Sequence, residues 1–223
     1  MKKIACDQKH CFFCRACSKE WLELTALKKQ TFLVKKNEEL LTEGARVTGM
    51  YFMLSGAVKV HKQWGEKELI IRFAKQGDIL GVRGFGDTVY RISATALADS
   101  TACFIPEYHI RSSLHINIDL SYKLMQFYAT ELNNAEQRMS DLAHRDVKGR
   151  IAETLFMLQD AFGEAADHFL ALPVSRQDIA AYAGTTYETV FKVFTEWITS
   201  GWIKTDGKRI QIKNKKNLRS CIV

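Results

Sequence analysis

The stretch SRQDIAAYAGTTYETVFKVFTEWITSG, residues 175–201, is the most informative part of the sequence for the fold of the C-terminal region. Ser175 and Asp178 have the spacing of a capping box, which predicts the start of a short helix. Gly184 ends this helix, and Thr186 can cap a second one. The second helix has apolar residues at helical spacing, namely Val190, Val193, Phe194, Trp197 and Ile198. Two helices are therefore expected to meet across a tight turn.

Three positions make this helix pair typical of a DNA-binding helix-turn-helix. Ala180 is small where the helices cross, Gly184 can take positive φ in the turn, and Val190 is a branched apolar residue that locks the second helix. The next residues, GWIKTDGKRIQI at 201–212, form two alternating runs around Asp206 and Gly207. They predict a β-hairpin beside the helix pair, which makes a winged helix-turn-helix.

The candidate DNA-binding residues lie on the first turns of these helices and on the hairpin. We expect the start of the second helix to enter a major groove, where Glu188 accepts a hydrogen bond from cytosine N4 and Lys192 donates to guanine O6 or N7. Lys204 and the other basic residues of the hairpin would lie against phosphates. The full candidate set is Ser175, Arg176, Thr185, Thr186, Tyr187, Glu188, Thr189, Lys192, Lys208 and Arg209.

The distribution of charge fits a nucleic-acid partner. The 223 residues carry a net charge of +7, but residues 37–200 hold 16 Lys or Arg against 21 Asp or Glu, so the positive excess lies at the two ends. A basic terminus is also common in segments that are only solvated, so the motifs are needed to distinguish nucleic-acid binding from simple solvation. No run of about 20 apolar residues and no signal-peptide core is present, and we expect a cytoplasmic protein that does not enter a membrane.

The chain before residue 107 has the pattern of an antiparallel β domain. Short β-like runs, including a long one over 92–105, are punctuated by glycines, which predicts a sandwich, barrel or jelly roll. In one run we expect Val58 and Val60 to point inward, and His61 and Lys62 to point outward.

From Leu120 to Leu142 the apolar residues recur in steps of mostly three and four, which predicts an amphipathic helix of about 25 residues. Its near-heptad stripe suggests a partner helix from a second copy of the chain. The fold class is therefore α+β. The expected parts are a Cys-rich segment and helix (1–30), a β-barrel sensor domain (31–115), a dimerisation helix (116–145) and a winged helix-turn-helix (146–223).

This arrangement resembles the Crp/Fnr family of bacterial transcription regulators. The resemblance covers about Leu33 to Asn214, and its most specific motifs are GDILG at 77–81, RDVKGRIAETL at 145–155 and SRQDIAAYAGTTYETV at 175–190. It implies a β domain of the cyclic-nucleotide-binding type, a homodimer on an inverted repeat of double-stranded DNA, and RNA polymerase as a partner. It also implies a regulator rather than an enzyme.

The residues that hold a cyclic nucleotide in this family are not matched. Nucleotide-binding members have a glutamate after the glycine of the GDxxG motif and an arginine about ten residues later. Here Val82 and Arg83 follow Gly81, Ser93 stands at the place of the arginine, and Arg91 lies two residues away. The chain therefore resembles the Fnr-like branch more closely, and we expect no cyclic AMP or cyclic GMP. Another ligand, held by an arginine of this region, stays an alternative.

The N-terminal cysteines are candidate metal ligands. Cys11, Cys14 and Cys17 have the C-x2-C-x2-C spacing that lets three thiolates bind one [4Fe-4S] cluster. The resemblance to the oxygen-sensing Fnr branch implies that Cys103 is the fourth ligand. Cys6 is the alternative fourth ligand, in a tetrahedral site that would suit zinc. Redox-active thiols without a metal are a third interpretation.

The leading hypothesis is a homodimeric, sequence-specific DNA-binding regulator that senses a redox or gaseous signal. One alternative is a regulator of the same family with another ligand, or none, in the β domain, and a variant of it is a haem sensor with His61 and His109 as axial ligands. An alternative of another class is a metalloenzyme with a nucleic-acid-binding tail. Against the enzyme, the sequence has neither a nucleophile paired with a base nor a phosphate-binding glycine loop.

Overall fold

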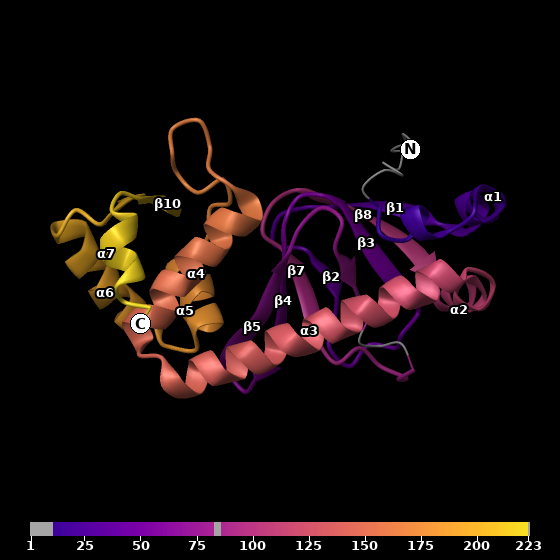
Figure 1. The fold of residues 1–223 in the computed structure, drawn as a ribbon, viewed down its shortest axis with the longest axis horizontal. Helices are drawn as coiled ribbons and strands as arrows, with labels where there is room; N and C mark the ends of the chain where they lie inside the picture. The colour runs from indigo at the N-terminus through magenta and orange to yellow at the C-terminus, as the bar shows by residue number, and fades with distance from the viewer. Residues whose placement is uncertain (1–10, 83–85, 223) are drawn as a thin grey trace. The chain divides into compact units, whose positions relative to one another are not determined.

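The computed structural model describes residues 11–82 and 86–222, and its contacts divide the chain into two compact units. The first unit comprises Met1–Lys62 and Ile71–Leu132, and the second comprises Gln63–Ile70 and Asn133–Val223. The elements up to residue 106 are η1 (Cys14–Ala16), α1 (Lys19–Lys28), β1 (Gln30–Val34), β2 (Glu39–Leu41), β3 (Gly49–Ser55), β4 (Val58–Trp64), β5 (Lys67–Ala74), β6 (Ile79–Leu80), β7 (Ser93–Ala96) and β8 (Ser100–Pro106) (Figure 1). Those that follow are α2 (Glu107–Ile116), α3 (Ile118–His144), α4 (Val147–Phe162), α5 (Arg176–Ala183), α6 (Tyr187–Thr199), β9 (Ile203–Asp206), β10 (Arg209–Ile212) and α7 (Lys215–Arg219).

The β domain consists of two four-stranded sheets, with the strand orders β1-β8-β3-β6 and β2-β7-β4-β5. Strands far apart in sequence pair antiparallel, as β1 and β3 do on either side of β8. This confirms the antiparallel β domain and the α+β class. The long run predicted over 92–105 is two strands in different sheets, β7 and β8, because the chain turns between Leu97 and Asp99.

The sheet that contains β8 separates two apolar clusters. Phe52 and Cys103 are paired neighbours, and both lie in a cluster that also contains residues of η1, α2 and α3. Their chain neighbours Met53 and Ala102 are also paired, and they lie in the cluster between the two sheets. Successive side chains of a strand point to opposite faces, which explains the division. Cys103 therefore faces the helices rather than the interior of the β domain.

Helix α1 is attached to α2 by a small polar network. The Trp21 indole stacks on the His109 ring at a centroid distance of 5.3 Å, and its Nε1 donates to Ser113 Oγ at 2.7 Å. Thr25 Oγ1 donates its one proton to the Trp21 carbonyl and lies 2.8 Å from His109 Nε2. His109 Nε2 must therefore carry a proton and donate to Thr25, since a neutral imidazole has one donor and one acceptor.

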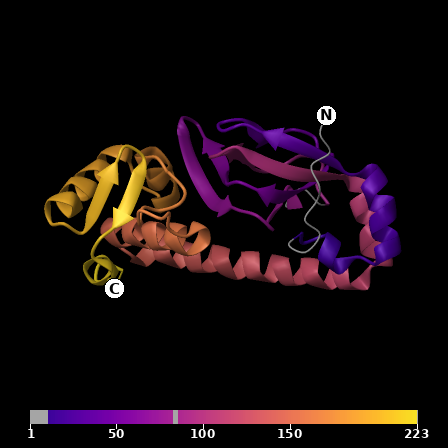
Figure 2. The same ribbon diagram turned by 90° about the horizontal axis from the view of Figure 1, so that it is seen from above.

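In the second unit, the helix-turn-helix has the local structure that its sequence predicts. Ser175 and Asp178 form a complete capping box at the start of α5, and Thr186 caps α6 by accepting from the Thr189 amide. Gly184 has a φ of +63°, the left-handed conformation that L-residues with a Cβ resist. Strands β9 and β10, side by side in Figure 2, form the predicted hairpin with Gly207 in the turn.

Two arginines hold the C-terminal end of α5. Arg150 Nε donates to the Ala183 carbonyl at 2.8 Å, and Arg138 Nη2 donates to the Tyr182 carbonyl at 2.6 Å. The Arg138 guanidinium also lies 3.9 Å from the centre of the Tyr182 ring. The last carbonyls of a helix need donors from outside the helix, and cations suit its negative end. These contacts fix the orientation of α5 within its unit.

Helix α3 carries two apolar stripes on different faces. Leu120 and Leu124 are buried and Phe127 is partly buried in the cysteine-containing cluster. A second stripe repeats in alternating steps of three and four residues and is exposed to solvent: Met125, Tyr128, Leu132, Ala135, Met139 and Leu142. This is the a/d pattern of a coiled coil. Among the residues that the structure describes, no helix is both long and apolar enough to cross a membrane.

The attachment of α1 should depend on pH through His109. This side chain is 3% exposed, and burial, followed by the nearby charge of Lys28, lowers its pKa. The stability that the neutral ring contributes should be complete above its ordinary pKa of about 6.5 and should be lost as pH falls through the lowered pKa. Urea unfolding of the wild type and of His109→Gln should show the wild type losing more stability between pH 7.5 and 5. Equal losses in the two proteins would contradict this assignment.

Candidate nucleic-acid interface and cysteine cluster

Helix α6 presents the predicted base-reading residues on its exposed side. Val190, Phe194 and Trp197 are at most 1% exposed and hold one face of the helix against the core of the unit. Because the helix turns by about 100° per residue, Glu188 and Lys192 then lie one turn apart on the outside, and both are exposed. The packing of one face thus determines which side chains a groove could meet.

Glu188 is ionised at neutral pH and can only accept hydrogen bonds. Its pKa is lowered by a hydrogen bond from its own backbone amide, then by one from the Thr186 hydroxyl, and also by the charge of Lys192. An ionised carboxylate in this place suits an exocyclic amino group such as cytosine N4. Lys192 supplies the neighbouring donor.

Two of the predicted DNA-binding residues, at the start of α5, have different surroundings. Ser175 Oγ is engaged in the capping box, where it accepts from the Asp178 amide at 3.1 Å and bonds to the Asp178 carboxylate. Arg176 lies over two rings of α6, with its guanidinium carbon 5.8 Å from the Phe191 centroid and 5.7 Å from that of Phe194. Its Nε is buried without a hydrogen-bond partner. Ser175 therefore shapes the helix, whereas Arg176 joins α5 to α6.

The wing carries both an exposed and a paired basic residue. Lys208 is exposed in the turn of the hairpin. Arg209 forms an ion pair with Asp167 and lies 4.4 Å from the centre of the Phe169 ring.

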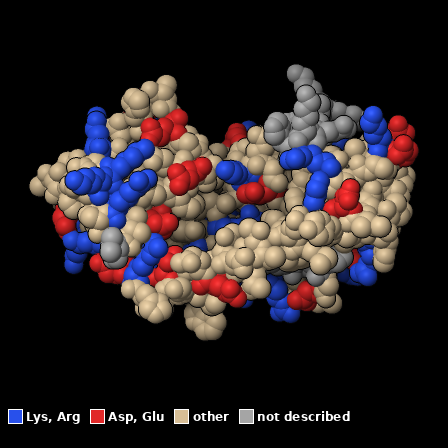
Figure 3. All heavy atoms as spheres, viewed as in Figure 1, with Lys and Arg blue, Asp and Glu red and all other residues tan. Residues whose placement is uncertain are grey.

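Thr185, in the turn between α5 and α6, donates its backbone amide to the Ala180 carbonyl at 3.0 Å. Blue side chains are grouped in Figure 3 over the part of the chain that Figure 1 labels α6, α7 and β10.

The four cysteines predicted to bind metal belong to one apolar cluster. Cys11, Cys14 and Cys103 are 3%, 8% and 2% exposed, and the partly buried Cys17 packs against the same cluster. Residues that are about 90 positions apart in the sequence are thus brought together. Cys6, the alternative ligand, lies outside the described residues.

The thiols share one cluster, but they do not form a ready metal site. Burial, the nearby thiol of Cys11 and, in the opposite sense, Lys123 together raise the pKa of Cys17 to about 12. Cys17 is therefore protonated at neutral pH until a cation stabilises its thiolate. Within residues 11–82 and 86–222, no group of three or more His, Cys, Asp or Glu side chains is arranged to hold a metal ion. The donors fit a thiolate-bound cluster in kind and number, and metal binding would have to draw them closer together.

The two histidines considered as haem ligands both contact other side chains of the protein. His109 Nε2 bonds to Thr25 and its ring stacks on Trp21, as described above. His61 Nε2 lies 2.8 Å from Thr95 Oγ1. His61 lies on the strand face opposite to Val60, as predicted, but it is only 8% exposed, so the exposure to solvent expected of an outward polar residue is not found. These contacts give both rings structural roles.

The positions that the sequence comparison with nucleotide-binding members singled out make other contacts here. Val82 is 3% exposed and its carbonyl accepts from the Tyr128 hydroxyl at 2.7 Å. Arg91 is paired with Asp87, with 2.7 Å between Nε and Oδ2, and Ser93 Oγ accepts from the Glu43 amide. Arg83 lies outside the described residues.

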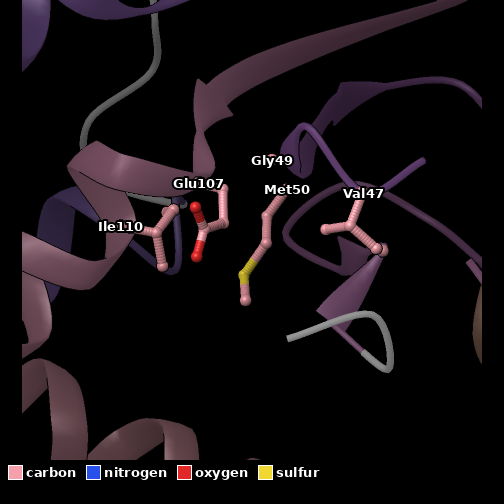
Figure 4. A pocket seen from close by; sticks show the side chains of 6 residues that line it. Val47, Gly49, Met50, Glu107 and Ile110 are labelled. Atoms are coloured by element: carbon pink, nitrogen blue, oxygen red, sulfur yellow. The ribbon is translucent and has the colours of Figure 1, made fainter. Parts of the chain in front are cut away.

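A small hollow lies between β3 and α2. The side chains of Met50, Glu107 and Ile110 point into it, and Val47, Gly49 and Gly81 complete its lining (Figure 4). Its empty volume of about 170 Å³ is below the ~300 Å³ at which ligand pockets begin. We assign no ligand to it.

Two further residues belong to the interface region. Phe191, which is 50% exposed, lies beside Lys192 and one turn after Tyr187, and the presence of a large ring at this place in the sequence already suggests an altered half-site. Asp167, the partner of Arg209, is 42 residues away in sequence, and no local pattern indicates that pairing.

Both parts of the chain match known domain families. Residues 31–117 match the cyclic nucleotide-binding domain, and residues 149–221 match the Crp-like helix-turn-helix domain. The transcriptional activator protein FnrA of Stutzerimonas stutzeri is 30% identical over 183 residues, which cover 80% of this chain and 75% of FnrA. A CRP-like cAMP-activated global transcriptional regulator of Mycobacterium tuberculosis is 26% identical, over 87% of this chain and 90% of that protein.

Solved structures agree with these matches. FixK2 from Bradyrhizobium japonicum has a TM-score of 0.77 and 26% identity, covering 87% of this chain and 98% of FixK2. A regulator from Eubacterium rectale has a TM-score of 0.78 at 15% identity, covering 96% of this chain and 99% of that one, and shows likeness of fold alone. The matched relatives are transcription regulators, not enzymes. With the winged helix-turn-helix, the β domain and this degree of identity, the chain belongs to the Crp/Fnr family of DNA-binding transcription regulators.

Proposed function

We propose that this regulator acts as a homodimer that reads an inverted repeat and responds to a redox or gaseous signal through its cysteine cluster. The observation that carries the proposal is the gathering of Cys11, Cys14, Cys17 and Cys103 in one buried cluster. RNA polymerase is the expected partner at the promoter. The similarity to FnrA, named as a transcriptional activator, supports a place in the Fnr-like branch.

The exposed stripe of α3 supports the dimer. Its residues repeat in the a/d pattern, yet Met125, Leu132 and Met139 are 67%, 60% and 63% exposed in the single chain. A helix that leaves such a stripe in water gains stability by packing it against a second copy. Two-fold symmetry would place two α6 helices about 34 Å apart, one turn of DNA, on an inverted repeat.

The cysteine cluster supports the sensor. A [4Fe-4S] cluster would supply iron that oxidants can attack, and the four thiols are of the type that binds it. Cys11, Cys14 and Cys17 would hold one end of the attachment and Cys103, on β8, the other. Because thiolates rather than thiols bind metal, the high pKa of Cys17 means that loading releases a proton. Gain or loss of this attachment would change how η1 packs against α2 and α3.

The dimer is tested by Met139→Glu, which places an unpaired carboxylate in the proposed seam. Burial of one partnerless charge costs about 3–5 kcal/mol, so the variant should be monomeric at micromolar concentration. Thr130→Glu adds the same charge on the opposite face of α3 and should stay dimeric. Light scattering gives the oligomeric state of both variants. A dimeric Met139→Glu protein would show that α3 does not form the dimer interface.

The sensor is tested by the metal content of anaerobically reconstituted protein. The wild type should hold about four iron atoms per chain and lose them in air, with about a hundredfold change in DNA affinity, which corresponds to about 2.7 kcal/mol. Cys14→Ser should prevent loading, whereas Cys221→Ser, outside the cluster, should not. One zinc atom per chain would instead favour a structural tetrahedral site. Iron-free wild type, or DNA binding indifferent to Cys14→Ser, would leave the cysteines without a sensory role.

Base reading is tested by Glu188→Ala. The loss of one base contact should reduce affinity for the selected site by about 1–3 kcal/mol and leave affinity for random DNA unchanged. Lys208→Ala is the contrasting variant, because loss of a phosphate contact should weaken both to a similar extent. Fluorescence anisotropy at fixed salt gives both affinities. An equal loss on both DNAs would show that Glu188 does not read bases.

A further inference from the structure

An apolar patch lies on the exposed side of α6, the side that we propose faces the major groove. Its residues are not part of the buried core of the unit. Phe191 is 50% exposed and Tyr187 is 41% exposed, while the buried positions of the helix are taken by other residues. The two rings stack at a centroid distance of 6.4 Å with an interplanar angle of 28°. Single exposed apolar residues are common on proteins, but a stacked pair beside Glu188 and Lys192 is a defined surface.

Arg176 fixes one side of this surface. Its guanidinium carbon lies 5.8 Å from the centre of the Phe191 ring, on the side of α5, and its Nε is buried and makes no hydrogen bond. Tyr187 contacts the same ring from the preceding turn. Phe191 is thus held by neighbours on two sides and open on the side that the helix presents to solvent. A ring held in this way loses little conformational freedom when it binds.

The chemistry of a phenyl ring limits what it can recognise in a major groove. It has no donor or acceptor, so against the amino and carbonyl edges of adenine, guanine or cytosine it would leave polar groups desolvated and unpaired. Thymine alone among the four bases presents an apolar group in that groove, the C5-methyl. Glu188 and Lys192 already supply the polar contacts, which leaves an apolar contact as the role that Phe191 can fill.

We propose that Phe191, supported by Tyr187 and Arg176, contacts a thymine C5-methyl group in each half-site and so determines specificity at that position. This inference rests on the proposed reading of DNA by α6 and deepens it. The expected half-site places a thymine next to the base pairs read by Glu188 and Lys192. Phe191 contributes through exclusion of water from the methyl group, so its effect should be independent of salt, unlike that of a phosphate contact.

The test removes the methyl group from the DNA rather than altering the protein. A high-affinity site is first selected from random DNA with the wild-type dimer, and each thymine is then replaced by deoxyuridine, which keeps its base pairing. At one position per half-site the affinity should fall about fourfold, the effect of one buried methyl group, and about fifteenfold when both half-sites are changed. Phe191→Ala should bind the thymine and uracil sites equally well.

The control variant is Ile198→Ala, which truncates another exposed apolar residue of α6, 41% exposed, near the far end of the helix. It should keep the full difference between thymine and uracil, and thermal unfolding of both variants verifies that they fold. Indifference of the wild type to uracil at every position would overturn the inference and leave the proposed function intact. So would a thymine preference that survives in Phe191→Ala. Failure of the wild type to select any sequence would instead refute the proposed function.

Discussion

The burial of one face of α6 is the constraint on which the DNA-binding surface depends. Trp197 is fully buried, and its ring stacks with those of Phe194 and Trp202 at centroid distances of 6.2 and 6.4 Å. Its indole Nε1 is buried with no hydrogen-bond partner, which costs about 1–3 kcal/mol. Packing of the large ring evidently outweighs that cost. A helix anchored in this way cannot rotate about its axis, so the identity of the residues that face outward is set by the core.

The cysteine segment shows a similar dependence on apolar neighbours. Phe13 lies between Cys11 and Cys14 in the sequence and is fully buried. Its ring packs edge-on against that of Phe52, with 5.6 Å between the ring centroids. Trp21 secures the following helix by its stacking on His109. These aromatic contacts place the thiols beside β8, so the attachment of the segment does not depend on the cysteines alone. A signal that alters the cysteines acts on a segment that already has a defined position.

Local patterns predicted the parts of the fold that depend on local chemistry. Caps and turns require particular residues a few positions apart, which is why Ser175, Gly184 and Thr186 indicated the helix-turn-helix correctly. Contacts across the fold could not be predicted in this way. His61 is buried and lies 2.8 Å from Thr95 of the adjacent strand β7, and strand order cannot be read from one run of residues.

The long helix shows the same limit. Its periodicity indicated a continuous apolar series, but the structure divides that series between a face buried in the first unit and an exposed stripe. A helical repeat reveals that apolar residues share a face, and only the surrounding fold decides which face is covered. The cysteines are an intermediate case, because the resemblance to a family, rather than spacing, connected Cys103 with the N-terminal group.

The position of strand β1 at a sheet edge indicates a second role for the basic residues of the N-terminal region. The strand lies at the border of its sheet, and Leu33 is 68% exposed there, so the strand offers unpaired backbone beside an apolar side chain. Such an edge is a template for aggregation. Lysine pairs flank it, at Lys28 and Lys29 before the strand and at Lys35 and Lys36 after it. Charges placed there repel a second strand, as gatekeeper residues do. Lys35 is also paired with Asp99 at 2.9 Å, so its charge is partly balanced within the chain. Positive charge at an edge strand disfavours pairing with a strand of another copy, an effect that needs no contact with DNA.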